Sequence, residues 1–118
     1  MNKTEHELLQ VLIDQQLTAV TFLLDYLNLG FNTSYLTIIS KPIIMSSDKK
    51  FDSASPDFCN QLLKCIGMKV EKVHIKTNNH MIINFNNGYK FFLSLKPEDY
   101  IAGEAMIYKD DSGHWWAI

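Results

Sequence analysis

The sequence predicts an α+β fold in which two helices pack on a mostly antiparallel, bent sheet. Apolar residues recur at helical spacing in two segments, and they alternate with polar residues in several others. The connecting segments are short, which favours antiparallel neighbours because a parallel pair needs a crossover of a dozen or more residues. At 118 residues the chain is long enough for one core, so we expect a single domain over residues 1–118.

An internal likeness between residues 17–42 and 70–97 also bears on the architecture. With a small insertion, the likeness pairs Val20 with Val73, Phe31 with Phe85, Tyr35 with Tyr89, Ser40 with Ser94 and Pro42 with Pro97. A period of about fifty residues is typical of repeated supersecondary units. Each copy follows a segment with helical spacing, so we expect two helix-plus-three-strand repeats, over about residues 4–42 and about residues 55–97.

The first repeat begins with a helix predicted over residues 5–15. Thr4 and Glu7 have the spacing of a capping box, and apolar residues then follow at helical spacing. Alternation predicts strands over residues 20–24, 27–31 and 35–40. Residues 41–54 are rich in turn formers, and we expect the least ordered segment there, with at most a short strand extension at residues 43–45.

The second repeat begins with a helix that Ser55 and Pro56 start and Gly67 ends. Strands are predicted over residues 70–76, 80–85 and 89–95, and the Asn87-Gly88 pair is a strong hairpin signal between the last two. Residues 98–100 indicate a turn or a short helical piece. A terminal β-hairpin over about residues 104–118 has no counterpart in the repeat.

Charge and composition restrict the classes of partner. The formal net charge is −2, and all eleven basic residues are lysines. Without arginine the chain lacks bidentate recognition of phosphate or guanine, so we expect no nucleic acid as a partner. No apolar run approaches the roughly 20 residues of a membrane span, and no secretory signal is present. Cys59 and Cys65 are too close on one predicted helix to favour a mutual disulfide, which predicts a reduced, cytoplasmic protein.

Candidate catalytic residues are few. His74 and His80 fall on adjoining predicted strands, but a zinc ion takes three or four ligands. Cys59 or Cys65 would be a nucleophile only if a histidine met it, and Cys65 lies on an apolar stripe. Asp25 interrupts an apolar run, where we prefer a turn residue over a buried carboxylate with a displaced pKa. We therefore predict no enzymatic activity, no metal and no cofactor.

The terminal segment carries the stronger binding signal, because it combines aromatic residues with acids. The candidate partner-binding residues are Glu98, Asp99, Tyr100, Glu104, Asp110, Asp111, Trp115 and Trp116. Aromatic anchors within a charged rim are typical of protein–protein hot spots, and an acidic face suits a basic partner. Alternation on a strand allows only one of Trp115 and Trp116 to face the core.

Two motifs extend these observations to a family. The segments VTFLLDYLNLGF…LT…P and LSLKPEDYIAGEA resemble a family of small uncharacterised bacterial proteins with a VxFVxDYxxLxF…LT core and a SLxPEDxxGPEA-like ending. The resemblance spans Val20 to Ala105, and Ala102 stands where the family usually has proline. It implies no particular activity.

Our leading hypothesis from the sequence is a non-catalytic cytosolic binding protein. By analogy of size, compartment and acidity, it would be an immunity protein that neutralises a bacterial toxin by protein–protein contact. One alternative is a small-molecule-binding or enzymatic domain with a pocket between the repeats, formed by Asp25, Tyr26, His74 and His80. Another is a structural homodimer that pairs through an exposed sheet edge.

Overall fold

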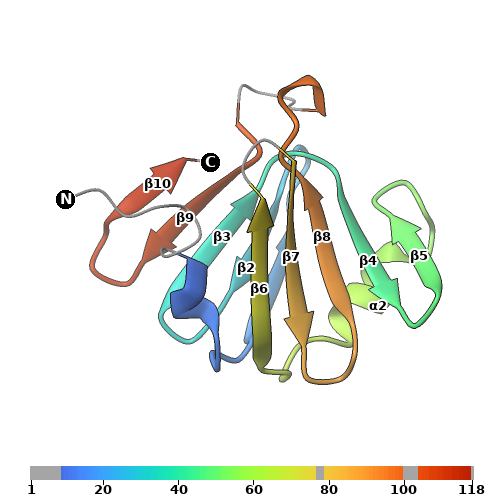
Figure 1. The fold of residues 1–118 in the computed structure, drawn as a ribbon, viewed down its shortest axis with the longest axis horizontal. Helices are drawn as coiled ribbons and strands as arrows, with labels where there is room; N and C mark the ends of the chain where they lie inside the picture. Colours follow the sequence, from blue (N-terminus) through green and yellow to red (C-terminus); the bar gives the residue numbers. More distant parts are fainter. Residues whose placement is uncertain (1–8, 77–78, 100–103, 118) are drawn as a thin grey trace.

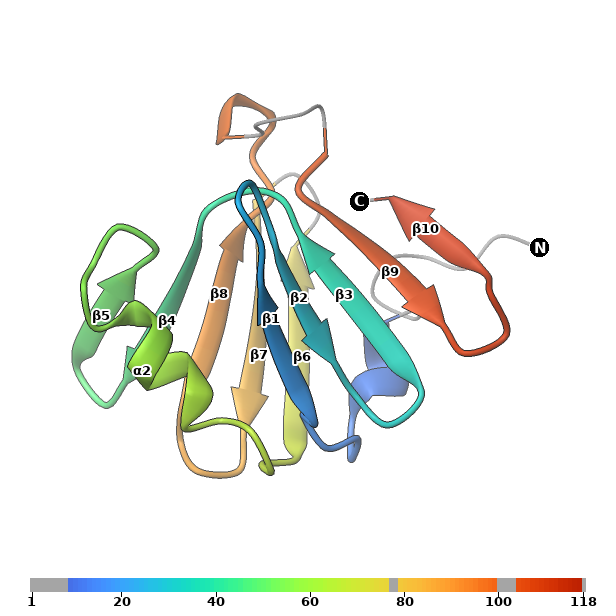
Figure 2. The same ribbon diagram turned by 180° about the vertical axis from the view of Figure 1, so that it is seen from behind.

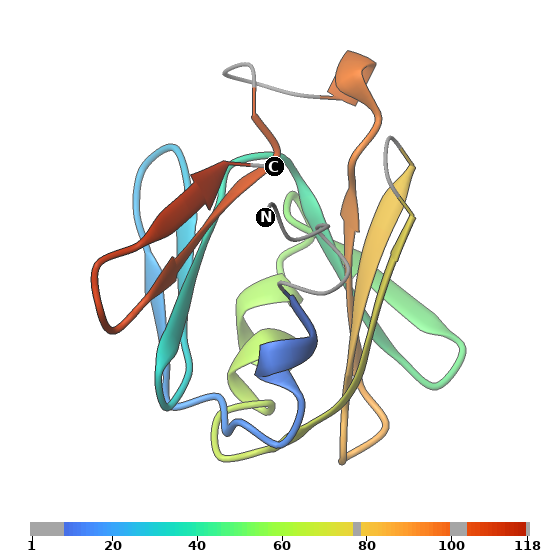
Figure 3. The ribbon, with the colours of Figure 1, turned by 60° about the vertical axis from the view of Figure 1, so that its left-hand side comes forward.

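The computed structural model describes residues 9–76, 79–99 and 104–117, in which ten strands form two antiparallel sheets (Figure 1). The first sheet contains, in spatial order, β1 (Ala19–Phe22), β2 (Leu27–Gly30), β3 (Ser34–Ile38), β9 (Met106–Asp110) and β10 (Trp115–Ala117). The second sheet contains β5 (Lys49–Asp52), β4 (Pro42–Ser46), β8 (Lys90–Ser94), β7 (His80–Phe85) and β6 (Val70–Lys76). Figure 3 shows the two sheets as opposing layers.

Helical structure in the described ranges is limited to three short pieces: η1 (Gln10–Leu12), α2 (Phe58–Leu63) and η2 (Pro97–Asp99). The η1 turn lies beside β6, and α2 lies beside β4 and β5. Both pieces are seen between the two sheets in Figure 3. Within the described residues, no helix combines the length and the apolar character needed to cross a membrane.

The predicted α+β fold built from two helix-plus-three-strand repeats is therefore wrong. In the described part of the first predicted helix only one 3-10 turn forms, because Ile13 already has ψ 133° and Asp14 has φ +71°. Thr4 and Glu7 lie outside the described residues. The second helix has six residues, and its apolar contacts are completed by the turn that follows, where Cys65 is buried. A few leucines at helical spacing are thus buried by single helical turns in this protein, without a longer helix.

The chain exchanges hairpins between the two sheets. After the β1–β2–β3 meander it crosses at residues 39–41 into the second sheet, where the β4–β5 hairpin pairs with β8. After the β6–β7–β8 meander it returns to the first sheet, where the β9–β10 hairpin pairs with β3. Residues that align between segments 17–42 and 70–97 do not all have equivalent positions in the fold. For example, Pro42 is buried in β4, whereas Pro97 is exposed in η2.

Strand β5 is the element that the sequence prediction missed. Residues 41–54 form a regular hairpin, in which Ser47 makes the turn with φ +55° and Ile44 pairs with Phe51. The other three residues of β5 are exposed. An edge strand with a single half-buried side chain lacks the alternation that identifies strands in a sequence.

The centre of the core is formed where one row of side chains from each sheet faces the other, and the neighbouring inward-facing rows of both sheets are buried as well. Cross-strand register places one residue per strand in each row. The first sheet contributes Val20, Leu29, Leu36, Tyr108 and Trp116. The second contributes Val73, Ile83, Phe91, Ile44 and Phe51. The central members of both rows are almost completely buried, and exposure increases toward the sheet edges.

Truncation of a central core residue should be costly. Leu36 is fully buried, so Leu36→Ala should lower the free energy of unfolding by about 2–5 kcal/mol, through lost apolar burial and a cavity. The neighbouring Tyr35 is 51% exposed on the opposite face, and Tyr35→Ala should cost less than about 1 kcal/mol. Urea unfolding followed by circular dichroism measures both. Equal losses for the two variants would contradict this arrangement of the sheet.

Candidate functional site

The turn between β9 and β10 is held by the carboxylate of Asp110. Its Oδ1 accepts hydrogen bonds from the backbone N–H of Ser112 at 3.0 Å, from Ser112 Oγ at 2.7 Å and from the backbone N–H of His114 at 3.0 Å. These bonds, the Ser112 hydroxyl first, lower the pKa of Asp110 below its ordinary value. The N–H of Asp111 donates to the carbonyl of Thr33 at 3.0 Å and so ties the hairpin to the β2–β3 turn. Asp110 thus shapes the turn, and Asp111 is exposed on it.

The two tryptophans of β10 lie on opposite faces of the first sheet, as alternation requires. Trp116 pairs with Tyr108 in register on the core side, and the centroids of their rings are 5.4 Å apart. It nevertheless keeps 38% of its surface exposed, because β10 is an edge strand. Trp115 pairs with Lys109 on the outer side and is 64% exposed.

Trp115 belongs to a row on the outer face that the sequence did not reveal. Lys109 pairs with Trp115 on one side and with Tyr35 of β3 on the other. Tyr35 is 51% exposed. Two large aromatic side chains therefore flank one lysine on the solvent-facing surface of the first sheet. Figure 2 shows strands β3, β9 and β10, which carry them, from that side. We call Tyr35, Lys109 and Trp115 the aromatic face.

A shallow hollow of about 530 Å³ adjoins the aromatic face. The row continues from Tyr35 to Gly30 and then Ala19, whose side chains are absent or small. A Cβ added to Gly30 would lie 3.4 Å from Ala19 Cβ, so a larger residue would crowd the β1 strand. Thr37 Oγ1 donates to Asn28 Oδ1 at 2.8 Å across the floor of the hollow. Because Gly30 and Ala19 are small, no side chain of that row screens Tyr35 from solvent on this side.

The other predicted acidic residues lie elsewhere. Glu98 and Asp99 belong to η2, beside the second sheet, where Ser94 Oγ donates to Asp99 Oδ2 at 2.6 Å. Both line a hollow of about 620 Å³ together with Lys41, Lys96 and other residues. Glu104 is half-buried in the segment before β9. Tyr100 lies outside the described residues. Only Asp110, Asp111, Trp115 and Trp116 of the predicted contact set share one hairpin.

The residues of the alternative pocket are not brought together. Asp25 and Tyr26 line a hollow of about 470 Å³ at the tip of the β1–β2 hairpin, next to Leu24, which is 98% exposed. His74 and His80 lie on β6 and β7, on the outer face of the second sheet, and line none of that hollow. Asp25 is exposed, as expected for a turn residue. The predicted site between the repeats is therefore divided between two surfaces.

The two strand histidines are in contact with each other. Their ring centroids are 5.5 Å apart, and His80 stacks on Phe92 at 5.7 Å. Burial, followed by the charges of His74, Lys76 and Lys96, lowers the pKa of His80 below 6.5. Over the described ranges, no group of three or more histidine, cysteine, aspartate or glutamate side chains has the geometry to hold a metal ion.

The two cysteines differ in environment. Cys59 is exposed, and Cys65 is buried beneath the turn that follows α2. Burial raises the pKa of the Cys65 thiol to about 11, against a smaller lowering by a hydrogen bond with Asn87. Since the thiolate is the nucleophilic form, the raised pKa makes Cys65 a poor nucleophile, and its side chain acts as a small apolar residue of the core.

This difference predicts selective thiol labelling. Ellman's reagent at pH 8 should modify Cys59 quickly, whereas Cys65 is about 0.1% thiolate at that pH and is shielded from solvent. The variant Cys59→Ser should therefore react only when urea unfolds the protein, and Cys65→Ser should react like the wild type. Fast labelling of folded Cys59→Ser would show that the turn around Cys65 opens readily.

The histidine contact predicts a pH effect on stability. The pKa of His80 is below 6.5 in the folded state, so the unfolded chain binds more protons in that range. The contribution of His80 to stability is complete above pH 6.5 and is lost as the pH falls through the folded-state pKa. A ¹H–¹⁵N NMR titration should show a midpoint below 6.5 for His80. Lys96→Gln should raise it, and the distant control Lys64→Gln should not.

Comparison of the chain with protein-family models, with curated proteins and with solved structures found no match. Function is therefore inferred from the exposed surfaces of the structure. Three of them combine exposure with a distinctive composition: the aromatic face, the apolar tip of the β1–β2 hairpin, and the outer face of the second sheet.

Proposed function

We propose that the protein is a non-catalytic binding protein that recognises a protein partner through the aromatic face. The observation that supports this most directly is the exposure of Trp115 and Tyr35 at 64% and 51% on one row of the sheet. Exposed aromatic side chains cost free energy in water, and tryptophan and tyrosine are enriched among the residues that dominate binding energy in interfaces.

The surroundings of the aromatic face suit a protein ligand. The hollow beside Tyr35 can accept a protruding side chain, and Asp111 and His114 on the hairpin turn are exposed polar groups at the rim. The face is built on paired strands, so little conformational freedom is lost when a partner docks. This combination of rigid aromatic anchors and a polar rim is the composition of specific protein–protein interfaces.

The biological role that we propose is neutralisation of a toxin in the cytoplasm. The proposal combines this face with an analogy to immunity proteins in small size and acidity, since the chain has 118 residues and a net charge of −2. A toxin domain would be inhibited when the aromatic face covers its active site. No chemistry on the part of this chain is required.

The product of the adjacent gene is the partner to test. The purified pair should form a complex in which tryptophan fluorescence changes, and the toxin's activity should fall in proportion to complex formation. Trp115→Ala and Tyr35→Ala should each weaken binding about 30-fold, which corresponds to about 2 kcal/mol for an interface anchor.

Tyr26→Ala is the matched control, because Tyr26 is 43% exposed at the tip of the β1–β2 hairpin. It should change affinity less than about 2-fold. Thermal unfolding of each variant separates loss of contact from loss of structure. Absence of a complex at micromolar concentration, or equal affinities for Trp115→Ala and the wild type, would disprove the proposal.

A further inference from the structure

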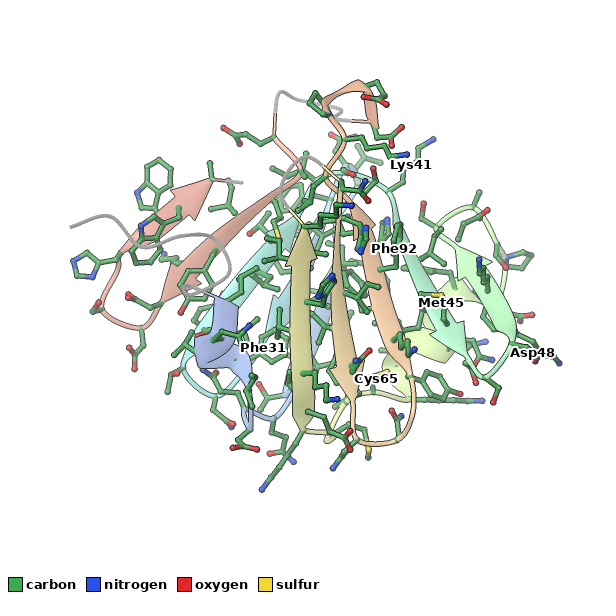
Figure 4. All side chains as sticks on the ribbon, in the orientation of Figure 1. Phe31, Lys41, Met45, Asp48, Cys65 and Phe92 are labelled. Atoms are coloured by element: carbon green, nitrogen blue, oxygen red, sulfur yellow. The ribbon has the colours of Figure 1, made fainter. Side chains whose placement is uncertain are left out.

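The outer face of the second sheet carries an apolar strip that remains partly exposed to solvent. Cross-strand register places His74, Ile82, Phe92 and Ile43 in one row across β6, β7, β8 and β4. Ile82, Phe92 and Ile43 are half-buried, as is Met45 further along β4. Figure 4 shows Phe92 and Met45 on this face. The strip crosses four strands and is therefore about 14 Å long at a strand spacing of about 4.8 Å.

Lysines border this strip on two sides. The row on one side contains Lys72, Asn84, Lys90, Met45 and Lys50. The row on the other side contains Lys76, His80 and Ser94. The four lysines are exposed. We call Ile43, Ile82 and Phe92 with Lys50, Lys72, Lys76 and Lys90 the lysine-rimmed face.

Acidic residues also border this face. On the five strands they are Asp52, which pairs with Ile43 and so continues the apolar row onto β5, and Glu71, at the bulge of the edge strand β6. Glu98 and Asp99 of η2 line a hollow together with Ile43 and Phe92 of the strip and with Lys41 and Lys96. The four exposed lysines of this face outnumber the two acids on its strands, so positive charge predominates there in a chain whose net charge is −2.

Aromatic rings and positively charged groups lie together on this face. The rings of His74, His80 and Phe92 form a continuous series across three strands. Burial is the main factor that disfavours the protonated form of His80, and the charges of His74, Lys76 and Lys96 add to it. Its Nδ1 is hydrogen-bonded to Asn79 Oδ1, and Glu98 and Asp99 lie nearby across the hollow. An anion docked here would relieve repulsion among these groups.

We propose that the lysine-rimmed face is a docking surface for an acidic segment of another protein whose apolar side chains cover the strip of Ile43, Ile82 and Phe92. An apolar centre inside a charged rim is the usual composition of a protein interface. Charge complementarity favours an acidic partner, since Lys50, Lys72 and Lys90 border the apolar contact on one side and Lys76 borders it on the other. The absence of arginine removes the bidentate and stacked guanidinium contacts that favour nucleic acid as a ligand.

This surface is distinct from the aromatic face, because the two lie on the outer sides of opposite sheets (Figure 3). A partner on one would leave the other free. The inference therefore does not rest on the toxin-neutralising role, and different residues test the two.

The probe is a 13-residue acidic amphipathic peptide with leucine or phenylalanine at every third or fourth position and glutamate on both flanks. Fluorescence anisotropy of the labelled peptide at 50 mM salt should show saturable binding that weakens with salt. Lys72→Glu/Lys90→Glu should reduce affinity at least 10-fold, and Phe92→Ala should do the same. The controls Lys64→Glu/Lys69→Glu and Tyr35→Ala, on other surfaces, should change it less than 2-fold.

NMR supplies a second measurement at the site itself. Saturating peptide should raise the pKa of His80, because bound carboxylates favour the protonated ring. If Lys72→Glu/Lys90→Glu fails to fold, Lys50→Glu/Lys76→Glu tests the same rim from its other two positions. The same peptide with lysine in place of glutamate should not bind.

Three results would overturn the inference. The first is unchanged peptide affinity in the folded rim variants. The second is tighter binding of a 20-base-pair DNA duplex than of the acidic peptide, which would assign the face to nucleic acid. The third is a wild-type dimer in light scattering that the rim variants dissociate, which would assign the face to a second copy of the chain.

Discussion

The packing of the inward-facing apolar side chains of one sheet against those of the other is the interaction on which the structure depends. Leu29, Leu36 and Tyr108 meet Ile83, Phe91 and Ile44 with almost no exposed surface. Because each strand contributes alternate residues to this contact, the other residues are fixed on the outer faces. Tyr35 faces solvent because Leu36 is in the core, and Phe92 faces solvent because Phe91 is. Both proposed binding surfaces are thus consequences of core register.

The sequence predicted the structure well where neighbouring strands are also consecutive along the chain. Strands β6, β7 and β8 have clear alternation and an Asn-Gly turn, and they form within a residue or so of the predicted positions. Helices were over-predicted because Leu9 and Leu12 have helical spacing, although one turn is enough to bury both. Strand β5 was missed because a strand with a single half-buried side chain, Phe51, carries no periodic signal.

The long-range pairings could not be predicted from local patterns. Strands β3 and β9 are adjacent in space, and nothing within either strand specifies the other. The same limit applied to the candidate site. Alternation in the sequence predicts that one of the two tryptophans faces solvent. It does not predict that Tyr35 lies in the same row as Trp115, because the pairing of β3 with β9 places Lys109 between them. The acids grouped by sequence proximity were dispersed, because η2 and the β9–β10 turn lie beside different sheets.

The exchange of hairpins also determines the order in which the molecule can be completed during synthesis. On the ribosome, β3 emerges 68 residues before β9 begins, since they end and start at residues 38 and 106. At about 5–20 residues per second, the nascent chain spends several seconds with that strand edge lacking its neighbour. An open edge is a template for pairing with other chains. The β9–β10 hairpin therefore covers the long-exposed edge of β3, and the three-residue strand β10 becomes the edge of the sheet in its place.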